Sequence, residues 1–222
     1  MGQEIRERGA LTRLGLLEAT GRLLDQQSPL EVSVHAIARE AGSSPATFYV
    51  YFTDVRDAIF ALVETLNDDF MASVVPSLQG PWPRRQVRQR VEAFVKANYA
   101  FWDRHRRLLV VRNLEADLGD DRFFSQRIDM NLPLLNALAE RILEQRGTDN
   151  LSEKEAFAQA VVSCAAMEEL FSHAPESYRD DHPVAVSDII QAEIDIICRA
   201  LGISTRSTKA VVPVKTSKGK KV

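Results

Sequence analysis

The segment SVHAIAREAGSSPATFYVYF, residues 33–52, limits the possible fold more than any other part of the chain. It opens on a serine, a residue that caps helix N-termini well, and Val34, Ile37 and Ala41 then recur at helical spacing. Gly42 follows this apolar face directly, and helices commonly end at glycine because it adopts the left-handed conformation without strain. The pattern predicts a short helix that stops at a tight turn.

A second short helix is expected after the turn. Ser44 can cap it, and Pro45 takes the first helical position, where its missing N–H is not needed. Before the segment, Leu16 and Leu23 belong to one apolar face of a longer helix over residues 12–27. Two short helices that are joined by a tight, glycine-containing turn and braced by a third helix form a helix-turn-helix.

Helical spacing also dominates the rest of the chain, and we find no convincing run of the period-two alternation that marks strands. We therefore predict an all-α fold with about nine helices. After the helix-turn-helix, the expected helices cover residues 54–75, 84–102, 105–117, 121–146, 152–172 and 185–201. The expected organisation is a helix-turn-helix unit over residues 1–53, the connecting helix 54–75, a larger helical domain over 76–203, and a disordered basic tail over 204–222.

The composition is that of a globular protein. The chain has 222 residues, 45% of them hydrophobic and 27% charged, which allows one sizeable core or two small ones. No apolar run approaches the roughly 18 residues of a membrane span, and the first residues do not resemble a signal peptide, so we expect a cytoplasmic protein without a membrane partner. Cys164 and Cys198 lie inside apolar helical patterns, so we expect buried thiols, no disulfide, no metal and no cofactor.

Charge is distributed unevenly along the chain. Residues 204–222 hold six basic side chains and no acid, so residues 1–203 keep 22 of the 28 basic side chains against all 31 acids, a formal charge of −9. An acidic body argues against a general nucleic-acid coat. It favours a locally built contact if DNA is the partner.

The aromatic residues of the second short helix divide by helical position. Phe48 and Phe52 are four residues apart, share one face and should pack inward. The small polar residues Ser43, Ser44 and Thr47 would stand at the end of the helix that approaches DNA in a helix-turn-helix. These residues alone also allow an alternative, a helical hairpin that binds no DNA and whose tyrosines are ordinary surface residues.

The stretch LLEATGRLLDQQSPLEVSVHAIAREAGSSPATFYVYFTDVRDAIFAL, residues 16–62, closely resembles the DNA-binding domain of the TetR family of transcriptional regulators. The resemblance runs without a gap and includes the family pattern V..IA.EAG.S..T.Y..F. It implies phosphate contacts from Ser44, Thr47 and Tyr49. It also implies DNA contacts from His35, Ala46, Val50 and Tyr51. We further expect contacts from Ser43, which precedes Ser44 at the same end of the helix, and from Arg56 at the start of the fourth helix.

Two positions depart from the usual family pattern. Family members often have His where Tyr51 stands, and Lys where Val55 stands, a lysine that touches phosphate from the start of the fourth helix. Arg56, one residue displaced, could supply this cation instead. Val50 and Ala46 offer only apolar contact, so hydrogen-bond readout by this helix should be sparse.

The resemblance also implies a ligand cavity and a dimer interface in the larger domain. The aromatic and Met side chains expected to line a largely apolar cavity are Phe94, Tyr99, Trp102, Phe123, Met130, Phe157 and Met167. Arg112 and Asn113 are candidates for a polar anchor, the ordinary alternative being solvated surface. The last two helices should pair with those of a second subunit, through Val161, Cys164, Phe171, Ile190, Ile194 and Ile197. The alternative is that these faces bury only the core of the single chain.

The sequence therefore predicts a homodimeric transcriptional regulator that binds double-stranded DNA at a palindromic operator and acts as a repressor. A small apolar effector would release it by shifting the population of conformations. Two other classes stay open: an enzyme that carries a helix-turn-helix, and a TetR-like protein that acts through protein contacts without DNA. We expect no enzymatic activity, because the larger domain lacks a convincing cluster of catalytic side chains.

Overall fold

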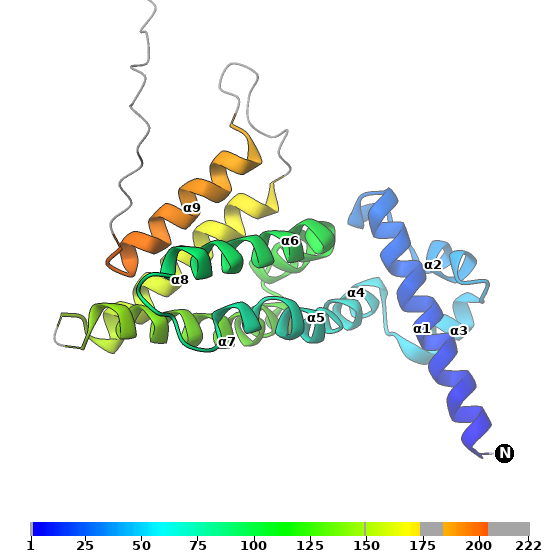
Figure 1. Cartoon of the computed structure of the whole chain (residues 1–222). Helices are drawn as coiled ribbons and strands as arrows, with labels where there is room; N and C mark the ends of the chain where they lie inside the picture. Colours follow the sequence, from blue (N-terminus) through cyan, green and yellow to red (C-terminus); the bar gives the residue numbers. More distant parts are fainter. Residues whose placement is uncertain (1, 149, 174–183, 204–222) are drawn as a thin grey trace, which may run out of the picture.

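The computed structural model of the chain describes residues 2–148, 150–173 and 184–203. All regular structure in these ranges is helical, so the all-α prediction is confirmed (Figure 1). No helix among these residues is long and apolar enough to cross a membrane. The predicted basic tail, residues 204–222, lies outside the described residues.

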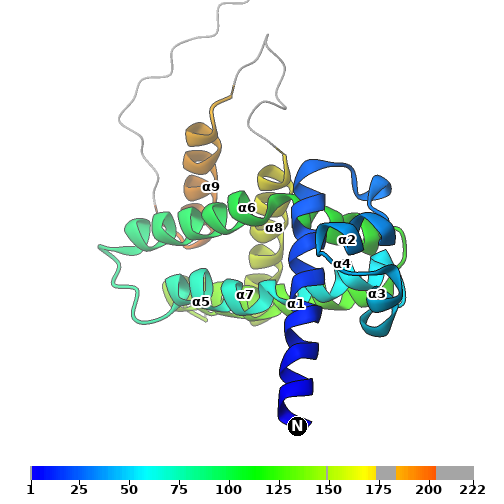
Figure 2. The same ribbon diagram turned by 90° about the vertical axis from the view of Figure 1, so that its right-hand side faces the viewer.

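Three helices build the N-terminal unit: α1 (Gly2–Gln26), α2 (Val34–Glu40) and α3 (Pro45–Tyr51), with a short 3-10 turn at Pro29–Glu31. α1 begins well before residue 12, where the apolar pattern starts, and its first turns project away from the rest of the molecule (Figure 2). α2 and α3 lie beyond α1, on the side away from α8 and α9 (Figure 1). The helix-turn-helix is thus presented at one end of the molecule.

The inner faces of these three helices meet in one apolar cluster. Leu16, Ile37 and Phe48, one from each helix, are completely buried. Burying such a side chain is worth about 1.5–3 kcal/mol, whereas an exposed ion pair, such as the one between Arg22 and Glu40 at 2.7 Å, contributes about 0–1 kcal/mol. Apolar packing therefore holds the N-terminal unit together.

The fourth predicted helix is interrupted. Instead of one helix over residues 54–75, the chain forms α4 (Val55–Glu64) and α5 (Leu66–Ser73). At Thr65 the side-chain hydroxyl donates to the Leu62 carbonyl at 2.6 Å, and the Thr65 N–H donates to the same carbonyl at 3.1 Å. These local bonds compete with the regular helical ladder. The prediction of a continuous helix was wrong at this residue.

A single long helix, α6 (Val87–Asp117), replaces the two helices expected over residues 84–102 and 105–117. The residues at the expected break, Asp103 and Arg104, include neither glycine nor proline. Charged residues alone do not end a helix, so the expected break was wrong.

Three further helices, α7 (Asp121–Arg146), α8 (Glu153–Ser172) and α9 (Val186–Ala200), complete the larger domain, together with a 3-10 turn at Val75–Leu78. α6 contacts α7, α8 and α9, and α7 packs along α8. The helices α8 and α9 lie at the far side of α6 from the N-terminal unit (Figure 1).

Two apolar clusters form the cores of the described residues, and α6 contributes to both. The larger cluster fills the space among α5 to α9. The smaller cluster is the core of the N-terminal unit, and it also takes in Val111 and Ala116 from α6 and Phe123 from α7. The two units therefore share packed side chains and do not hang on a free linker.

Glu193 of α9 is an acid inside the larger domain. It is 1% exposed, and neither carboxylate oxygen has a hydrogen-bond partner among the described residues. Burial raises the pKa of Glu193 from its ordinary value of 4.5 to about 7, because the charged form loses its hydration. The Glu193 carboxyl therefore binds its proton more tightly in the folded chain than in the unfolded chain.

This shift predicts a fall in stability as the pH rises. Tighter proton binding by Glu193 stabilises the folded chain by up to about 3 kcal/mol, and this stabilisation is fully present below pH 4.5. It is lost as the pH rises from 4.5 through the folded-state pKa of about 7. Glu193→Gln cannot ionise, so it should raise the free energy of unfolding at pH 8 and change it little at pH 4. Urea unfolding across this range measures the difference. Glu140→Gln, at a carboxyl that is 66% exposed, is the control; equal pH dependence in both variants would contradict the assignment.

Candidate DNA-binding and ligand sites

The turn between α2 and α3 depends on Gly42. Its φ is 62°, in the left-handed region that glycine adopts without steric cost. The Gly42 N–H donates to the Arg39 carbonyl at 3.1 Å, and the Ser43 N–H donates to the Ala38 carbonyl at 2.8 Å. These bonds satisfy carbonyls at the end of α2, and they set the direction in which α3 leaves the turn.

Two serines cap the two short helices, as the sequence predicts. Ser33 Oγ accepts the Ala36 N–H at 3.2 Å, and Ser44 Oγ accepts the Thr47 N–H at 3.1 Å. The hydroxyl oxygens of Ser44 and Thr47 also lie 2.9 Å apart and share a hydrogen bond. Two hydroxyls are thus held together at the N-terminal end of α3.

The side chains of α3 divide into a buried face and an exposed face. Phe48 and Phe52 are 0% and 3% exposed, as their helical positions predict. Tyr49 and Val50 are 60% and 74% exposed. The Tyr49 ring meets the Phe48 ring edge to face at 5.7 Å between centroids, so one side of Tyr49 rests on the core while the rest faces solvent.

Tyr51 lies differently from Tyr49. It is half-buried and packs against the core of the N-terminal unit. Its hydroxyl lies against α1, since a Cβ added at Gly9 would stand 3.4 Å from the hydroxyl oxygen. Of the other predicted DNA contacts near this end, His35 and Ala46 are exposed and Ser43 is half-buried.

Arg56, the predicted phosphate contact at the start of α4, is paired within the chain. Its Nε lies 2.9 Å from Glu115 Oε2, near the end of α6. Beside it, Arg122 of α7 lies 3.4 Å from Asp57 of α4 and 2.9 Å from Asp120. The pairs of Arg56 with Glu115 and of Arg122 with Asp57 join α4 to the larger domain. Sequence reasoning missed these two pairs because the partners are distant along the chain and no spacing pattern connects them.

The two parts of the chain match two family descriptions. Residues 16–61 match "Bacterial regulatory proteins, tetR family", and residues 77–195 match "Tetracyclin repressor-like, C-terminal domain". The chain belongs to the TetR family. It is a transcriptional regulator with a helix-turn-helix DNA-binding domain and a helical ligand-binding domain. No curated protein matches the sequence of the chain.

Solved structures of other regulators share the fold of this TetR-family protein. A TetR/AcrR-family regulator from Thermobifida fusca is 16% identical over 83% of this chain and 95% of its own, with a TM-score of 0.62. AibR, in complex with isovaleryl coenzyme A and operator DNA, is 14% identical over 83% of this chain and 97% of its own, with a TM-score of 0.61. FadR from Bacillus subtilis, in complex with stearoyl-CoA, is 13% identical over 85% of this chain and 97% of its own, with a TM-score of 0.60.

The residues predicted to line an apolar pocket in this TetR-family protein are mostly core residues. Six belong to the larger cluster or pack against it: Phe94, Tyr99, Trp102, Met130, Phe157 and Met167. Phe123 belongs instead to the smaller cluster, where its ring meets that of Phe60 at 5.2 Å between centroids. None of the seven lines the hollows described below.

A hollow of about 400 Å³ opens between α6, α7 and α8. Apolar and charged side chains line it together: Val110, Asn113, Leu114, Asp117, Arg127, Ala165, Glu168, Glu169 and Ser172. Arg127 lies 3.5 Å from Asp117 and 4.0 Å from Glu168, so its charge is compensated by carboxylates in the same wall. The hollow can therefore offer both apolar surface and hydrogen-bonding groups to a ligand.

Arg112 lies next to this hollow and is completely buried, so the alternative of a solvated surface position was wrong for it. Its Nη2 donates to Glu168 at 2.9 Å, and its Nε and Nη2 donate to Asn113 Oδ1 at 3.0 and 2.9 Å. Asn113 in turn donates to Glu168 at 2.9 Å. Burial lowers the pKa of Arg112 to about 10, with Glu168 opposing the shift, so the guanidinium stays charged near neutral pH. This network fixes α6 against α8.

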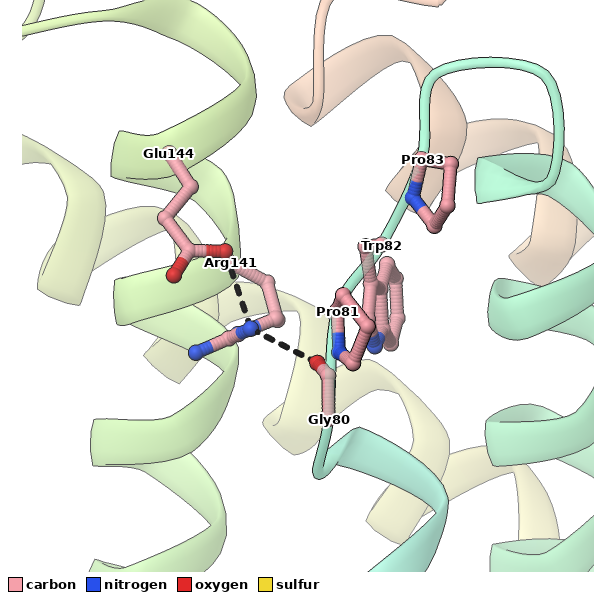
Figure 3. Close-up of a pocket in the computed structure, with 6 residues that line it drawn as sticks. All are labelled: Gly80, Pro81, Trp82, Pro83, Arg141 and Glu144. Atoms are coloured by element: carbon pink, nitrogen blue, oxygen red, sulfur yellow. Dashed lines mark hydrogen bonds and ion pairs between the residues drawn. The ribbon is translucent and has the colours of Figure 1, made fainter.

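A second hollow, of about 510 Å³, lies at the linker before α6 (Figure 3). The linker residues Gly80, Pro81, Trp82 and Pro83 form one side, and Arg141 and Glu144 of α7 form the other. Arg141 Nη1 donates to the Gly80 carbonyl at 3.0 Å and pairs with Glu144 at 2.9 Å. The contact holds the linker against α7, so we interpret this hollow as a structural junction.

The predicted dimer residues occupy both sides of the α8 and α9 pair. Phe171, Ile194 and Ile197 are buried in the chain's own core. Val161 is 39% exposed, whereas Cys164 and Ile190 are half-buried. Exposed apolar neighbours that were not predicted are Val162 at 68% and Ile196 at 45%. Val161, Val162 and Ile196 are thus exposed apolar residues outside the core, and we call these three residues the apolar strip.

The two tyrosines of α3 give a matched pair of variants. Tyr49→Phe removes a hydroxyl from the exposed face, and it should weaken binding to a target DNA about tenfold through the loss of one hydrogen bond to a charged phosphate. Tyr51→Phe removes the hydroxyl that lies against α1 and should change the affinity little. Fluorescence anisotropy at several salt concentrations measures both. Equal losses in the two variants would contradict the assignment of Tyr49 as the contact.

Proposed function

We propose that this protein is a homodimeric, effector-responsive repressor that binds a palindromic operator. The observation that carries the proposal is the exposed end of α3, where the bonded pair Ser44 and Thr47 stands beside exposed Tyr49. Hydroxyls and free helix N–H groups bind phosphate oxygens, and the exposed Val50 and Ala46 suit apolar contact with a thymine methyl. Because an operator-binding protein must reach the chromosome, the proposed location of the protein is the cytoplasm.

The apolar strip on α8 and α9 supports a homodimer. Val161, Val162 and Ile196 are exposed there, and side chains of this kind gain free energy when a second subunit covers them. A two-fold dimer presents the same recognition helix twice, to successive major grooves. This geometry is the reason to expect a palindrome.

The effector is proposed to be a small molecule with a large apolar part. Two proteins of the same fold were solved with coenzyme A thioesters, one of them with operator DNA as well. In this chain, Val110, Leu114 and Ala165 supply apolar surface in the hollow between α6, α7 and α8, and Asn113 and Arg127 supply polar groups. An effector with an apolar body and a polar end would fit this mixture of side chains.

The pair Arg56 and Glu115 supports a specific form of switching. The Arg56 guanidinium is the proposed phosphate contact, so a DNA phosphate and the Glu115 carboxylate compete for it. Glu115 lies directly after Leu114, which lines the hollow. An effector that moves this end of α6 would change the position of Glu115, and the population would shift toward a state with Arg56 withdrawn from DNA.

Two rival functions make different predictions. An enzyme with a helix-turn-helix would turn over its ligand. A TetR-like protein that acts only through protein contacts would bind no particular DNA. Neither rival predicts a complex that depends on a palindrome.

The decisive experiment is selection of genomic DNA fragments by the purified protein. We expect enriched fragments to share a palindrome, and we expect scrambling of one half-site to abolish the complex. Candidate effectors, including acyl-CoA thioesters, are then scored for release of the DNA. Recovery of fragments without a shared palindrome would refute the proposed function.

The proposed competition gives a prediction for Glu115. Glu115→Gln frees Arg56, so operator affinity should rise several-fold, and the slope of log affinity against log salt should steepen by up to about one. Glu140→Gln removes the same charge from an exposed position on α7 and is the control. Equal gains in both variants would point to net charge alone and would contradict the competition.

The apolar strip gives a prediction for Val162. Val162→Asp places a charge in the proposed interface, so dimers should dissociate at micromolar concentration, and the palindromic complex should weaken with them. Leu132→Asp, at a 42% exposed position on α7, is the control. Analytical ultracentrifugation measures the association state, and dimers that survive in Val162→Asp would exclude this strip as the interface.

A further inference from the structure

The first turns of α1 lie outside the part of the chain that matches the family. α1 begins at Gly2, whereas the match to the regulatory-protein family begins at residue 16. We call residues 2–15 the α1 extension, and its first turns project away from the rest of the molecule (Figure 2). We propose that the α1 extension is a second DNA-contacting element, which binds phosphates beside the groove that α3 occupies, through Arg6 and Arg13.

The DNA contacts proposed above supply little positive charge. Arg56 is the only Lys or Arg side chain among them, and it is paired with Glu115 at 2.9 Å. Affinity for DNA depends largely on Lys and Arg side chains that neutralise phosphates. Residues 1–203 carry a formal charge of −9, so the body of the chain repels DNA at long range. Cations from another element that lies close to α3 would offset this repulsion.

The α1 extension is packed against α3 at Gly9. A Cβ added at Gly9 would stand 3.4 Å from the hydroxyl oxygen of Tyr51, which is half-buried and ends α3. Because Gly9 has no side chain, the hydroxyl can lie directly against the backbone of α1. The extension therefore has a defined position beside α3, and its surface continues the proposed DNA-binding surface.

Arg6 and Arg13 lie on the face of α1 that carries Gly9. Arg6 is three residues before Gly9 and Arg13 is four residues after it, and residues at these spacings are neighbours on a helix surface. Both arginine side chains are exposed. At about 100° per residue, the acid Glu7 lies about 160° from Gly9 around the helix. The face that meets α3 therefore presents positive charge.

The Arg13 guanidinium lies at the end of α3. It stands over the ring of Phe52, the C-cap residue of α3, at 5.3 Å from the ring centroid. This contact uses the charge of the guanidinium and none of its N–H donors, which stay available for a phosphate oxygen. Within the described ranges neither Arg6 nor Arg13 forms an ion pair with a carboxylate. Arg22, further along the same helix, does pair with Glu40, at 2.7 Å.

The length of the α1 extension suits a contact at the edge of the groove. Gly2 to Arg8, seven residues, precede Gly9, and they span about 10 Å at a rise of about 1.5 Å per residue. The major groove of B-DNA is about 12 Å wide, so a helix of this length beside α3 reaches toward the backbone at one edge. Contacts with phosphates add affinity without reading the sequence.

The proposal rests on the proposed placement of α3 in a major groove, so its test uses two DNAs: an operator from the genomic selection and an unrelated duplex of equal length. Arg6→Gln should lower the affinity for both by a similar factor, about three- to tenfold. The slope of log affinity against log salt should fall by up to about one. Arg8→Gln removes the same charge two residues away, from another face of α1, and should leave both affinities nearly unchanged.

Arg13 needs a pair of variants because it also packs on Phe52. Arg13→Gln should weaken both complexes and reduce the salt slope, whereas Arg13→Lys keeps the charge and should keep the slope. Urea unfolding of both variants shows whether a loss of affinity comes from a loss of stability.

Two results would overturn the proposal. One is an equal loss in Arg6→Gln and Arg8→Gln, which would indicate net charge alone. The other is an unchanged salt slope in Arg6→Gln. If the genomic selection yields no palindrome, the proposed function fails, and the unrelated duplex at low salt still tests the α1 extension by itself.

Discussion

The arrangement of the molecule depends on the packing of α6 into two cores at once. Its first part fills the larger cluster with Phe94, Phe101 and Leu109, and its last turns place Val111 and Ala116 in the core of the N-terminal unit. Because α6 is one unbroken helix, a displacement at one core is carried to the other. The network of buried Arg112 with Asn113 and Glu168 fixes α6 against α8.

Much of the fold could be predicted from the sequence because its signals are local. The short helices of the N-terminal unit could be predicted from their N-caps, their apolar spacing and Gly42. Each of these signals involves residues only a few positions apart. The errors arose where local signals are weak. A break was expected between residues 102 and 105 although nothing there ends a helix, and a single threonine hydroxyl at Thr65 interrupted an otherwise regular pattern.

The candidate sites divide in the same way. The outward face of α3 followed from helical geometry, so the exposure of Tyr49 and Val50 could be predicted. The partners of Arg56 and Arg112 could not be predicted, because Glu115 and Glu168 approach them only after the helices have packed. A pattern of aromatic residues likewise does not tell a cavity from a filled core, and Phe94 and Met167 fill theirs.

The hydrogen bond between Ser44 and Thr47 has a consequence for the energetics of recognition. Both hydroxyls are already oriented by each other and by the backbone of α3 before any DNA is present. Little side-chain entropy then remains to be lost on association, so this end of the helix is preorganised for its target. Because these hydroxyls are assigned to phosphate oxygens, which are the same in every sequence, their preorganisation should strengthen binding to all DNA alike and leave discrimination to the neighbouring side chains.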